Sequence, residues 1–118
     1  MIYQPPVQTE LNILYSDQDI LAVDKPAGLL SVPGRGPDRQ DCLLSRVQQL
    51  FADALVVHRL DMSTSGVMIL ARNAAAQRQL SRQFELRQVK KSYLAIVSGR
   101  VVPHAGEIDL PLICDWPN

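Results

Sequence analysis

Short runs of apolar residues along the chain predict alternating strands and helices. Residues 12–15 and 19–24 predict two strands around a polar turn at 16–18. The second contains the run ILAV, apolar at every position, which is typical of a strand buried on both faces. Residues 67–71 form another continuous apolar run and predict a central strand.

Two stretches have helical spacing. The first predicts a helix over 42–52 with Asp41 as its N-cap, and the second a helix over 74–88 capped by Asn73. The apolar residues that define these helices are Leu43, Val47, Leu50 and Ala54 in the first and Ala76, Leu80 and Phe84 in the second.

Two further strands are predicted at 91–98 and 106–110. The element order is then ββαβαββ, an α+β fold with a mixed, mainly antiparallel sheet and two helices. The last two strands create sheet edges that need covering, either by the tail or by the rest of a longer protein.

Composition indicates one ordinary soluble domain of 118 residues, 47% apolar and 20% charged. Residues 1–11, with Pro5 and Pro6 and no periodicity, predict a flexible arm before a domain at 12–118. No apolar run reaches the roughly 18 residues of a membrane span, and the N-terminus does not resemble a signal peptide, so a cytoplasmic protein is expected.

Cysteine and histidine are too sparse for a metal site. Cys42 and Cys114 lie far apart without CxxC spacing and are interpreted as buried thiols, and His58 and His104 cannot supply a zinc or haem pattern. No zinc or haem site is therefore expected.

The net charge is zero but unevenly distributed. Residues 72–100 hold seven Lys and Arg against one Glu, a local excess of +6. This stretch is either a solvated helix face or a basic surface for nucleic acid.

The sequence HRLD at 58–61 is the strongest candidate for chemistry. On an extended segment, Arg59 and Asp61 project to one side, and His58 and Leu60 to the other. A sheltered, ionised Asp61 can act as a nucleophile or a base, or the two residues can form a structural ion pair. Both interpretations remain open from spacing alone.

Three other chemistries fit the sequence poorly. A hydrolase triad of His58, Asp61 and Ser65 fails because TSG is not GxSxG. A glycosidase would need a second carboxylate, and Glu85 sits among charged neighbours on a helix. The loop SVPGRGPDRQ lacks the spacing of an ATP-binding loop.

Four ordered motifs resemble the RluA-type pseudouridine synthases. HRLDMSTSGVMILARN resembles the family's HRLDxxTSGxxxxA, and ILAVDKPAGLLSVPG resembles its strand followed by NKPxGLxVxPG, with Asp24 where Asn is common. RQFELRQVKKSYLAIVSG resembles the helix followed by KxYxAxVxG, and DLPLICDWPN the DxPL segment. The resemblance covers residues 12–118 and implies the first part of that family's catalytic domain.

The resemblance implies roles for three residues. Asp61 corresponds to the catalytic aspartate that attacks the target uridine, Arg59 to the arginine that enters the RNA stack, and Tyr93 to the tyrosine that packs against the flipped base. Without the resemblance, the sequence favours Tyr93 as a core residue of a strand. The implied substrates are stem-loops of transfer RNA and large-subunit ribosomal RNA, with no cofactor. Arg78, Arg82, Arg87, Lys90 and Lys91 are the candidates for phosphate contacts.

One family motif does not occur in the chain. The later segment GRxHQLR, whose Arg pairs with the catalytic carboxylate, has no counterpart in the 118 residues. The alternative to an active enzyme is therefore a folded RNA-binding fragment without turnover; an unrelated α/β scaffold with a structural Arg–Asp pair is the third possibility.

Overall fold

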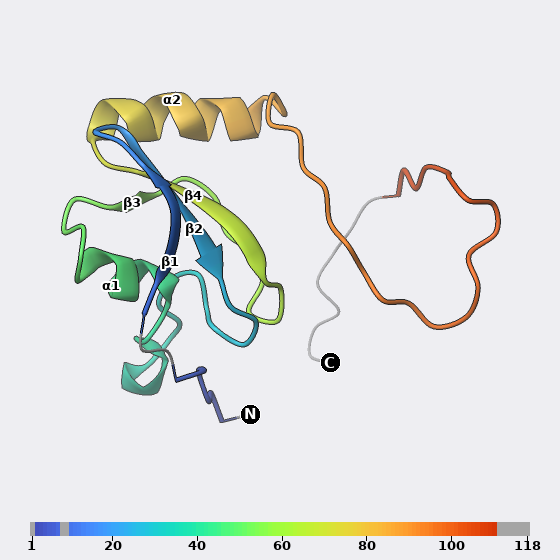
Figure 1. The fold of residues 1–118 in the computed structure, drawn as a ribbon, viewed down its shortest axis with the longest axis horizontal. Helices are drawn as coiled ribbons and strands as arrows, with labels where there is room; N and C mark the ends of the chain where they lie inside the picture. The colour runs from blue at the N-terminus through green and yellow to red at the C-terminus, as the bar shows by residue number, and fades with distance from the viewer. Residues whose placement is uncertain (1, 8–9, 111–118) are drawn as a thin grey trace.

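The computed structural model describes residues 2–7 and 10–110, and within them the chain forms a four-stranded antiparallel sheet with two α-helices (Figure 1). The strands are β1 (Asn12–Ser16), β2 (Ile20–Lys25), β3 (Leu55–Val56) and β4 (Gly66–Ala71). They are ordered β1-β2-β4-β3 across the sheet. The α+β prediction is confirmed, and β4 is central, as its apolar run indicated.

The pleat of β2 and β4 gives the sheet one fully buried face. Leu21, Val23 and Lys25 on β2 have no exposed surface, and Met68 and Leu70 on β4 are equally buried. The intervening residues of β2 are only half-buried. The expectation that the ILAV strand is buried on both faces is therefore wrong, because the core lies on one side of the sheet.

α1 (Leu43–Gln48) packs against this buried face through Leu43 and Val47. It is shorter than the predicted 42–52, and the predicted N-cap is wrong. Cys42 is the N-cap, with its Sγ accepting from the Ser45 amide at 3.4 Å. Asp41 is instead paired with Arg46 at 2.8 Å, and the hydrogen bond from that guanidinium lowers the pKa of the Asp41 carboxyl.

The cysteine interpretation is confirmed for one of the two residues. Cys42 is a buried free thiol. Cys114 lies outside the described residues. A short 3₁₀ helix, η1 (Pro37–Arg39), occupies the loop before α1.

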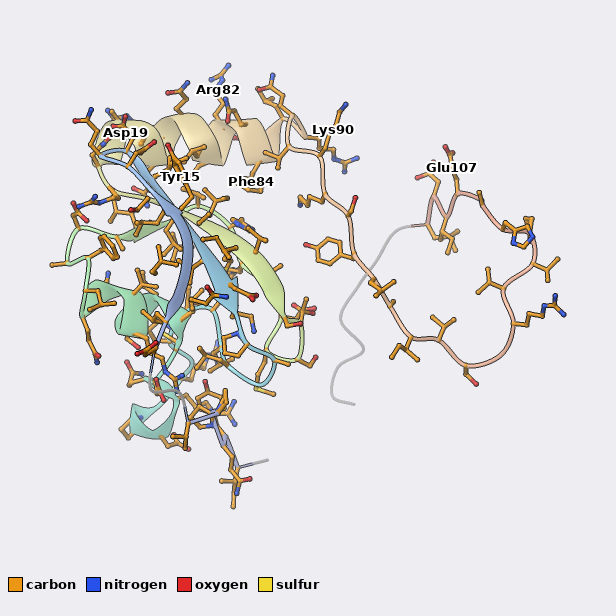
Figure 2. All side chains as sticks on the ribbon, viewed as in Figure 1. Tyr15, Asp19, Arg82, Phe84, Lys90 and Glu107 are labelled. Atoms are coloured by element: carbon orange, nitrogen blue, oxygen red, sulfur yellow. The ribbon has the colours of Figure 1, made fainter. Side chains whose placement is uncertain are left out.

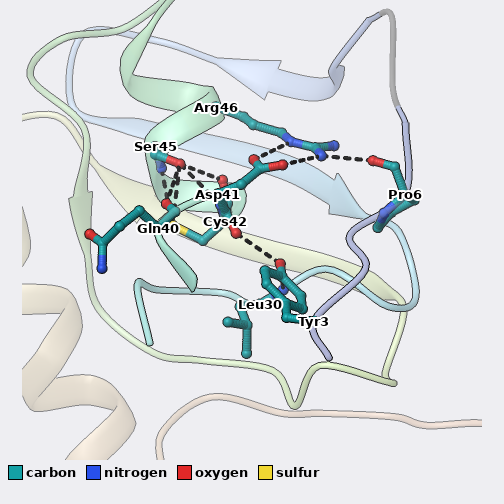
Figure 3. A network of polar contacts seen from close by, with 8 residues as sticks. All are labelled: Tyr3, Pro6, Leu30, Gln40, Asp41, Cys42, Ser45 and Arg46. Atoms are coloured by element: carbon teal, nitrogen blue, oxygen red, sulfur yellow. Dashed lines mark hydrogen bonds and ion pairs between the residues drawn. The ribbon is translucent and has the colours of Figure 1, made fainter. Parts of the chain in front are cut away.

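The N-terminal segment is connected to the core although residues 2–7 form no helix or strand. Tyr3 is 8% exposed, and its hydroxyl donates to the Asp41 carbonyl at 2.8 Å and accepts from the Leu30 amide at 2.9 Å. The Pro6 carbonyl accepts from Arg46 at 2.7 Å (Figure 3). These bonds join the predicted arm, α1 and the loop after β2.

α2 (Ala74–Glu85) begins at the predicted N-cap and contacts β3 and β4. The Asn73 Oδ1 accepts from the Ala76 amide at 2.8 Å, and its Nδ2 donates to Asp19 Oδ1 at 2.8 Å. The helix ends before the predicted residue 88. Phe84 points toward the sheet, whereas Arg82 points outward (Figure 2).

The predicted strands at 91–98 and 106–110 are wrong for the described chain. Residues 86–110 contain no helix or strand, and Leu94 and Ile96 are 100% and 101% exposed. A strand needs a hydrogen-bonded neighbour, and no described strand lies beside this segment, which leaves the sheet after α2 (Figure 1).

No helix among the described residues is long and apolar enough to cross a membrane.

Candidate active site

The segment 58–62 is attached to the rest of the protein at every second residue. His58 is attached through its side chain, and Leu60 and Met62 through their backbones. Leu60 is 8% exposed, whereas Arg59 and Asp61 are exposed. The predicted alternation along HRLD is confirmed: the attached residues face inward and the two candidate residues face outward.

Ser31 holds the middle of the segment with a single hydroxyl. Its Oγ donates to the Leu60 carbonyl at 2.5 Å and accepts from the Leu60 amide at 3.0 Å. Ser31 is itself 3% exposed. Both backbone groups of the residue directly before Asp61 are therefore satisfied by one buried side chain.

The loop that carries Ser31 is fixed by the start of α1. The Leu43 amide donates to the Leu30 carbonyl at 2.7 Å, and the Leu44 amide donates to the Ser31 carbonyl at 3.1 Å. The first amides of a helix have no partner within the helix, so they are available for such bonds. Helix α1 thus positions Ser31, and Ser31 positions Leu60.

Lys25 and Gly28 hold the far end of the segment. The Lys25 Nζ donates to the carbonyls of Pro26, Leu29 and Met62 at 3.1, 2.6 and 3.1 Å, and the Gly28 amide donates to the Met62 carbonyl at 2.7 Å. Burial lowers the pKa of Lys25, and the negative charge of Asp61 opposes that shift. A buried ammonium therefore lies within the electrostatic reach of the candidate nucleophile.

His58 attaches the near end of the segment to the sheet and to α2. Its Nε2 accepts from the Ile69 amide at 2.9 Å. Its ring stacks on Phe84, with centroids 4.3 Å apart and planes at 15°. Burial and the positive charge of Lys91 both lower the pKa of His58.

An open pocket of about 740 Å³ lies between the Ser31 loop and the 58–62 segment. Arg59 and Asp61 both line it. The other lining residues are Leu30, Ser31, Val32, Val57, His58, Leu60 and Met62. The pocket lining combines an exposed carboxylate and an exposed guanidinium with apolar residues such as Val32 and Val57, which suits an uncharged ring with polar edges.

The structural ion pair between Arg59 and Asp61, one of the two interpretations left open by the sequence, does not form in the described part of the chain. Both side chains are exposed on an extended segment, where solvation competes with a direct contact. This leaves both side chains available to a ligand in the pocket.

Tyr93 is not brought to this pocket. It is 64% exposed and is not among the lining residues. The prediction relied on a strand at 91–98, which the described chain does not form. Glu85 and Ser65, which were rejected from the sequence as residues of a glycosidase site and a hydrolase triad, are also exposed and outside the lining.

The supporting residues Lys25, Ser31 and His58 were not predicted from the sequence as part of the site. Their partners lie 37, 29 and 11 positions away along the chain. A lysine in a core-facing position of an apolar strand is the one local signal, because a buried lysine needs partners. No group of three or more His, Cys, Asp or Glu that could bind a metal ion occurs in the described ranges.

Comparisons with known proteins identify the family of the chain. The chain is 54% identical to the dual-specificity RNA pseudouridine synthase RluA of Vibrio parahaemolyticus, covering 98% of the chain and 46% of that protein. It is 53% identical to the RluA of Escherichia coli K12, covering 98% and 53%. SVPGR and LICDWPN also resemble RluA in particular, in agreement with both relatives. The chain thus spans about half the length of these proteins.

Two solved structures and a family-wide comparison also match pseudouridylate synthases. Human RNA pseudouridylate synthase domain containing 1 superposes with a TM-score of 0.54 at 31% identity, covering 71% of the chain and 31% of that protein. Domain containing 4 gives 0.52 at 29% identity, covering 65% and 30%. Residues 19–113 match the family described as RNA pseudouridylate synthase. The protein chain folded around the 58–62 segment therefore belongs to the RNA pseudouridylate synthase family.

Proposed function

We propose that the protein carrying this chain isomerises uridine to pseudouridine in structured RNA, with Asp61 as the nucleophile. The observation that carries the proposal is the position of Asp61: it is exposed at a pocket, on a segment held at every second residue. A fixed backbone with a free carboxylate is the arrangement that a positioned nucleophile requires. The proposed reaction is the one that membership of the RNA pseudouridylate synthase family suggests.

The reaction needs the uracil ring to leave the RNA stack. The C1′–N1 bond breaks and a C1′–C5 bond forms, while the C5 proton is lost and N1 gains a proton, so no cosubstrate is consumed. Extrusion of a base costs a few kcal/mol. Arg59 lies beside Asp61 on the same side of the segment, where its planar guanidinium can fill the vacated position and attract phosphates.

The proposed substrates are stem-loops of transfer RNA and large-subunit ribosomal RNA. The two bacterial relatives are named as dual-specificity enzymes, which supports more than one RNA. Exposed basic residues on and after α2 supply a surface for phosphates. These residues are Arg78, Arg82, Arg87, Lys90 and Lys91. Figure 2 shows Arg82 and Lys90 at the outer side of this region.

RNA binding without turnover is the second candidate function of the 118 residues taken alone. It is favoured by Tyr93, which is 64% exposed and outside the pocket. A base that enters the pocket would then lack its proposed stacking partner. Stacking of a base on an aromatic ring contributes about 1–3 kcal/mol, comparable to the cost of flipping.

The two candidates are separated by assaying two proteins on an unmodified anticodon stem-loop. One is the 118-residue chain, and the other is a chimera in which the Escherichia coli relative supplies the sequence after Asn118. Pseudouridine is read by chemical labelling. If only the chimera forms product, the isomerase proposal is supported and the 118 residues taken alone lack turnover. If neither protein forms product, the proposed activity is rejected.

Asp61→Asn in the chimera tests the nucleophile, because it keeps the shape and removes the charge. Asp38→Asn is the matched control, since Asp38 is exposed and does not line the pocket. Loss of product in the first and retention in the second is the expected result. Turnover by Asp61→Asn would remove Asp61 from this role.

A further inference from the structure

The imidazole of His58 takes the place of a strand residue beside β4. β3 pairs with β4 at Leu55↔Ala71 and Val56↔Leu70 and then ends. The next partner on this edge is the Ile69 amide, which donates to His58 Nε2 at 2.9 Å. A ring nitrogen thus continues the ladder at the point where the backbone turns away toward Arg59 and Asp61.

This hydrogen bond requires one protonation state. A backbone amide can only donate, so Nε2 must carry a lone pair, and the ring proton must be on Nδ1. An imidazolium has N–H groups at both nitrogens and would face the Ile69 N–H with a second donor. The ring is neutral in the arrangement that the structure shows.

The surroundings of the ring favour this neutral form. Phe84 covers one face at 4.3 Å, and Lys91 lies 5.6 Å from the Phe84 centroid and acts on His58 as a positive charge. β4 presents the uncharged Ile69. The charged residues of the neighbouring elements are Arg78, Arg82 and Glu85 on α2, all exposed, and Arg59 and Asp61 on its own segment.

We propose that His58 is a positioning residue that holds Arg59 and Asp61 toward the pocket only while its ring is neutral. Protonation removes the acceptor for Ile69 and detaches the near end of the segment. Leu60 stays attached through Ser31, so the displacement falls mainly on Arg59, which lies between the released and the retained anchor. The consequence for catalysis rests on the proposed function; the consequence for structure does not.

The first test is spectroscopic and uses the unaltered chain. Nitrogen-15 NMR of the His58 ring at pH 7.5 is expected to show a protonated Nδ1 and an unprotonated Nε2. On acidification, the Ile69 amide resonance is expected to shift with the same midpoint as the His58 ring. A ring proton on Nε2, or an Ile69 amide indifferent to the titration of His58, would overturn the proposal.

The second test separates the hydrogen bond from the ring stacking. His58→Gln can present an oxygen acceptor to Ile69 without a titrating group, whereas His58→Phe keeps an aromatic ring against Phe84 without an acceptor. Hydrogen exchange of the Ile69 amide is expected to be about ten-fold faster in the Phe variant than in the Gln variant. His104→Gln, at an exposed histidine, is the matched control and is expected to match the unaltered chain. Equal exchange in the Phe and Gln variants contradicts the proposal.

The third test measures the turnover rate of the chimera as a function of pH. The turnover rate is expected to fall as the pH drops through the His58 titration measured by NMR, and His58→Gln is expected to lose that acid limb, whatever its rate at neutral pH. An acid limb that persists unchanged in His58→Gln rejects the catalytic consequence. Absence of product at every pH would instead reject the proposed function, while the NMR results would still decide the role of His58.

Discussion

The strongest structural prediction concerns Ser31, because one hydroxyl satisfies both backbone groups of Leu60. Ser31→Ala removes the 2.5 Å bond to the Leu60 carbonyl and the 3.0 Å bond from the Leu60 amide. The two residues are 3% and 8% exposed, so both backbone groups lie in a largely buried part of the loop. The substitution adds no volume and deletes one oxygen, which isolates the hydrogen bonds.

The expected cost follows from the number of groups left without a partner. A buried polar group that loses its partner costs about 1–3 kcal/mol, which gives about 2–6 kcal/mol for two. The adjacent pocket of about 740 Å³ is open, so water can reach one side of this loop and replace part of the bonding. We therefore expect about 2–3 kcal/mol of destabilisation, a large part of the 5–15 kcal/mol typical of a domain.

Urea unfolding followed by circular dichroism measures this cost. Ser31→Ala is expected to lower the midpoint with an unchanged slope, since the same surface is exposed on unfolding. Ser98→Ala is the matched control, because Ser98 is exposed and lies in no helix or strand, and it is expected within about 0.5 kcal/mol of the parent. If Ser31→Ala unfolds with the same midpoint as Ser98→Ala, the hydroxyl does not hold the segment.

Three other predictions concern the cap of α2, the turn after β2 and the histidine. Asn73→Ala is expected to cost about 1–2 kcal/mol in urea unfolding, because the cap to Ala76 and the bond to Asp19 are both lost. Gly28→Ala is expected to cost about 1–2 kcal/mol in the same assay, because alanine is strained at the φ of 88°. A steric clash does not add to this cost, since the added Cβ would meet only Pro6 Cδ, at an ordinary 3.7 Å. The His58 pKa is lowered below 6.5 in the folded chain, so the unfolded chain binds the proton first. The contribution of His58 to stability is then complete above about pH 6.5 and declines as the pH falls from there through the folded pKa. Thermal unfolding of the parent at pH 5 and 7 should show this decline, and His58→Gln should show a smaller one.

The fold was predictable where local pattern and local chemistry agree. The apolar runs placed β1, β2 and β4, and Asn73 marked the start of α2 because its cap bond reaches only three residues along the chain. Asp41 was equally suited to a cap by its chemistry. Its carboxylate is taken by Arg46, and the cap moves to Cys42.

The error at 91–98 has a different origin. Alternating apolar residues describe a segment that would pair if a neighbour were available, and in the described chain none is. Periodicity reports which side chains would share a face, not whether a second strand is present. The predicted role of Tyr93 depended on that strand, so the structure gives this role no support and it stays a prediction.

Arg59 and Asp61 were placed correctly because alternation alone decides which residues of an extended segment share a side. The groups that impose the extended shape could not be predicted, since each reaches the segment from a separate element: Lys25 from β2, Ser31 from the loop before α1, and Ile69 from β4. Each contributes hydrogen bonds to a different alternate residue, so loss of one releases part of the segment and leaves the rest attached. The orientations of Arg59 and Asp61 should therefore respond differently to substitutions at these anchors. Substitution of Lys25 or Ser31, which hold the residues on either side of Asp61, should change the orientation of Asp61 more than that of Arg59. Substitution of His58 should change the orientation of Arg59 more than that of Asp61.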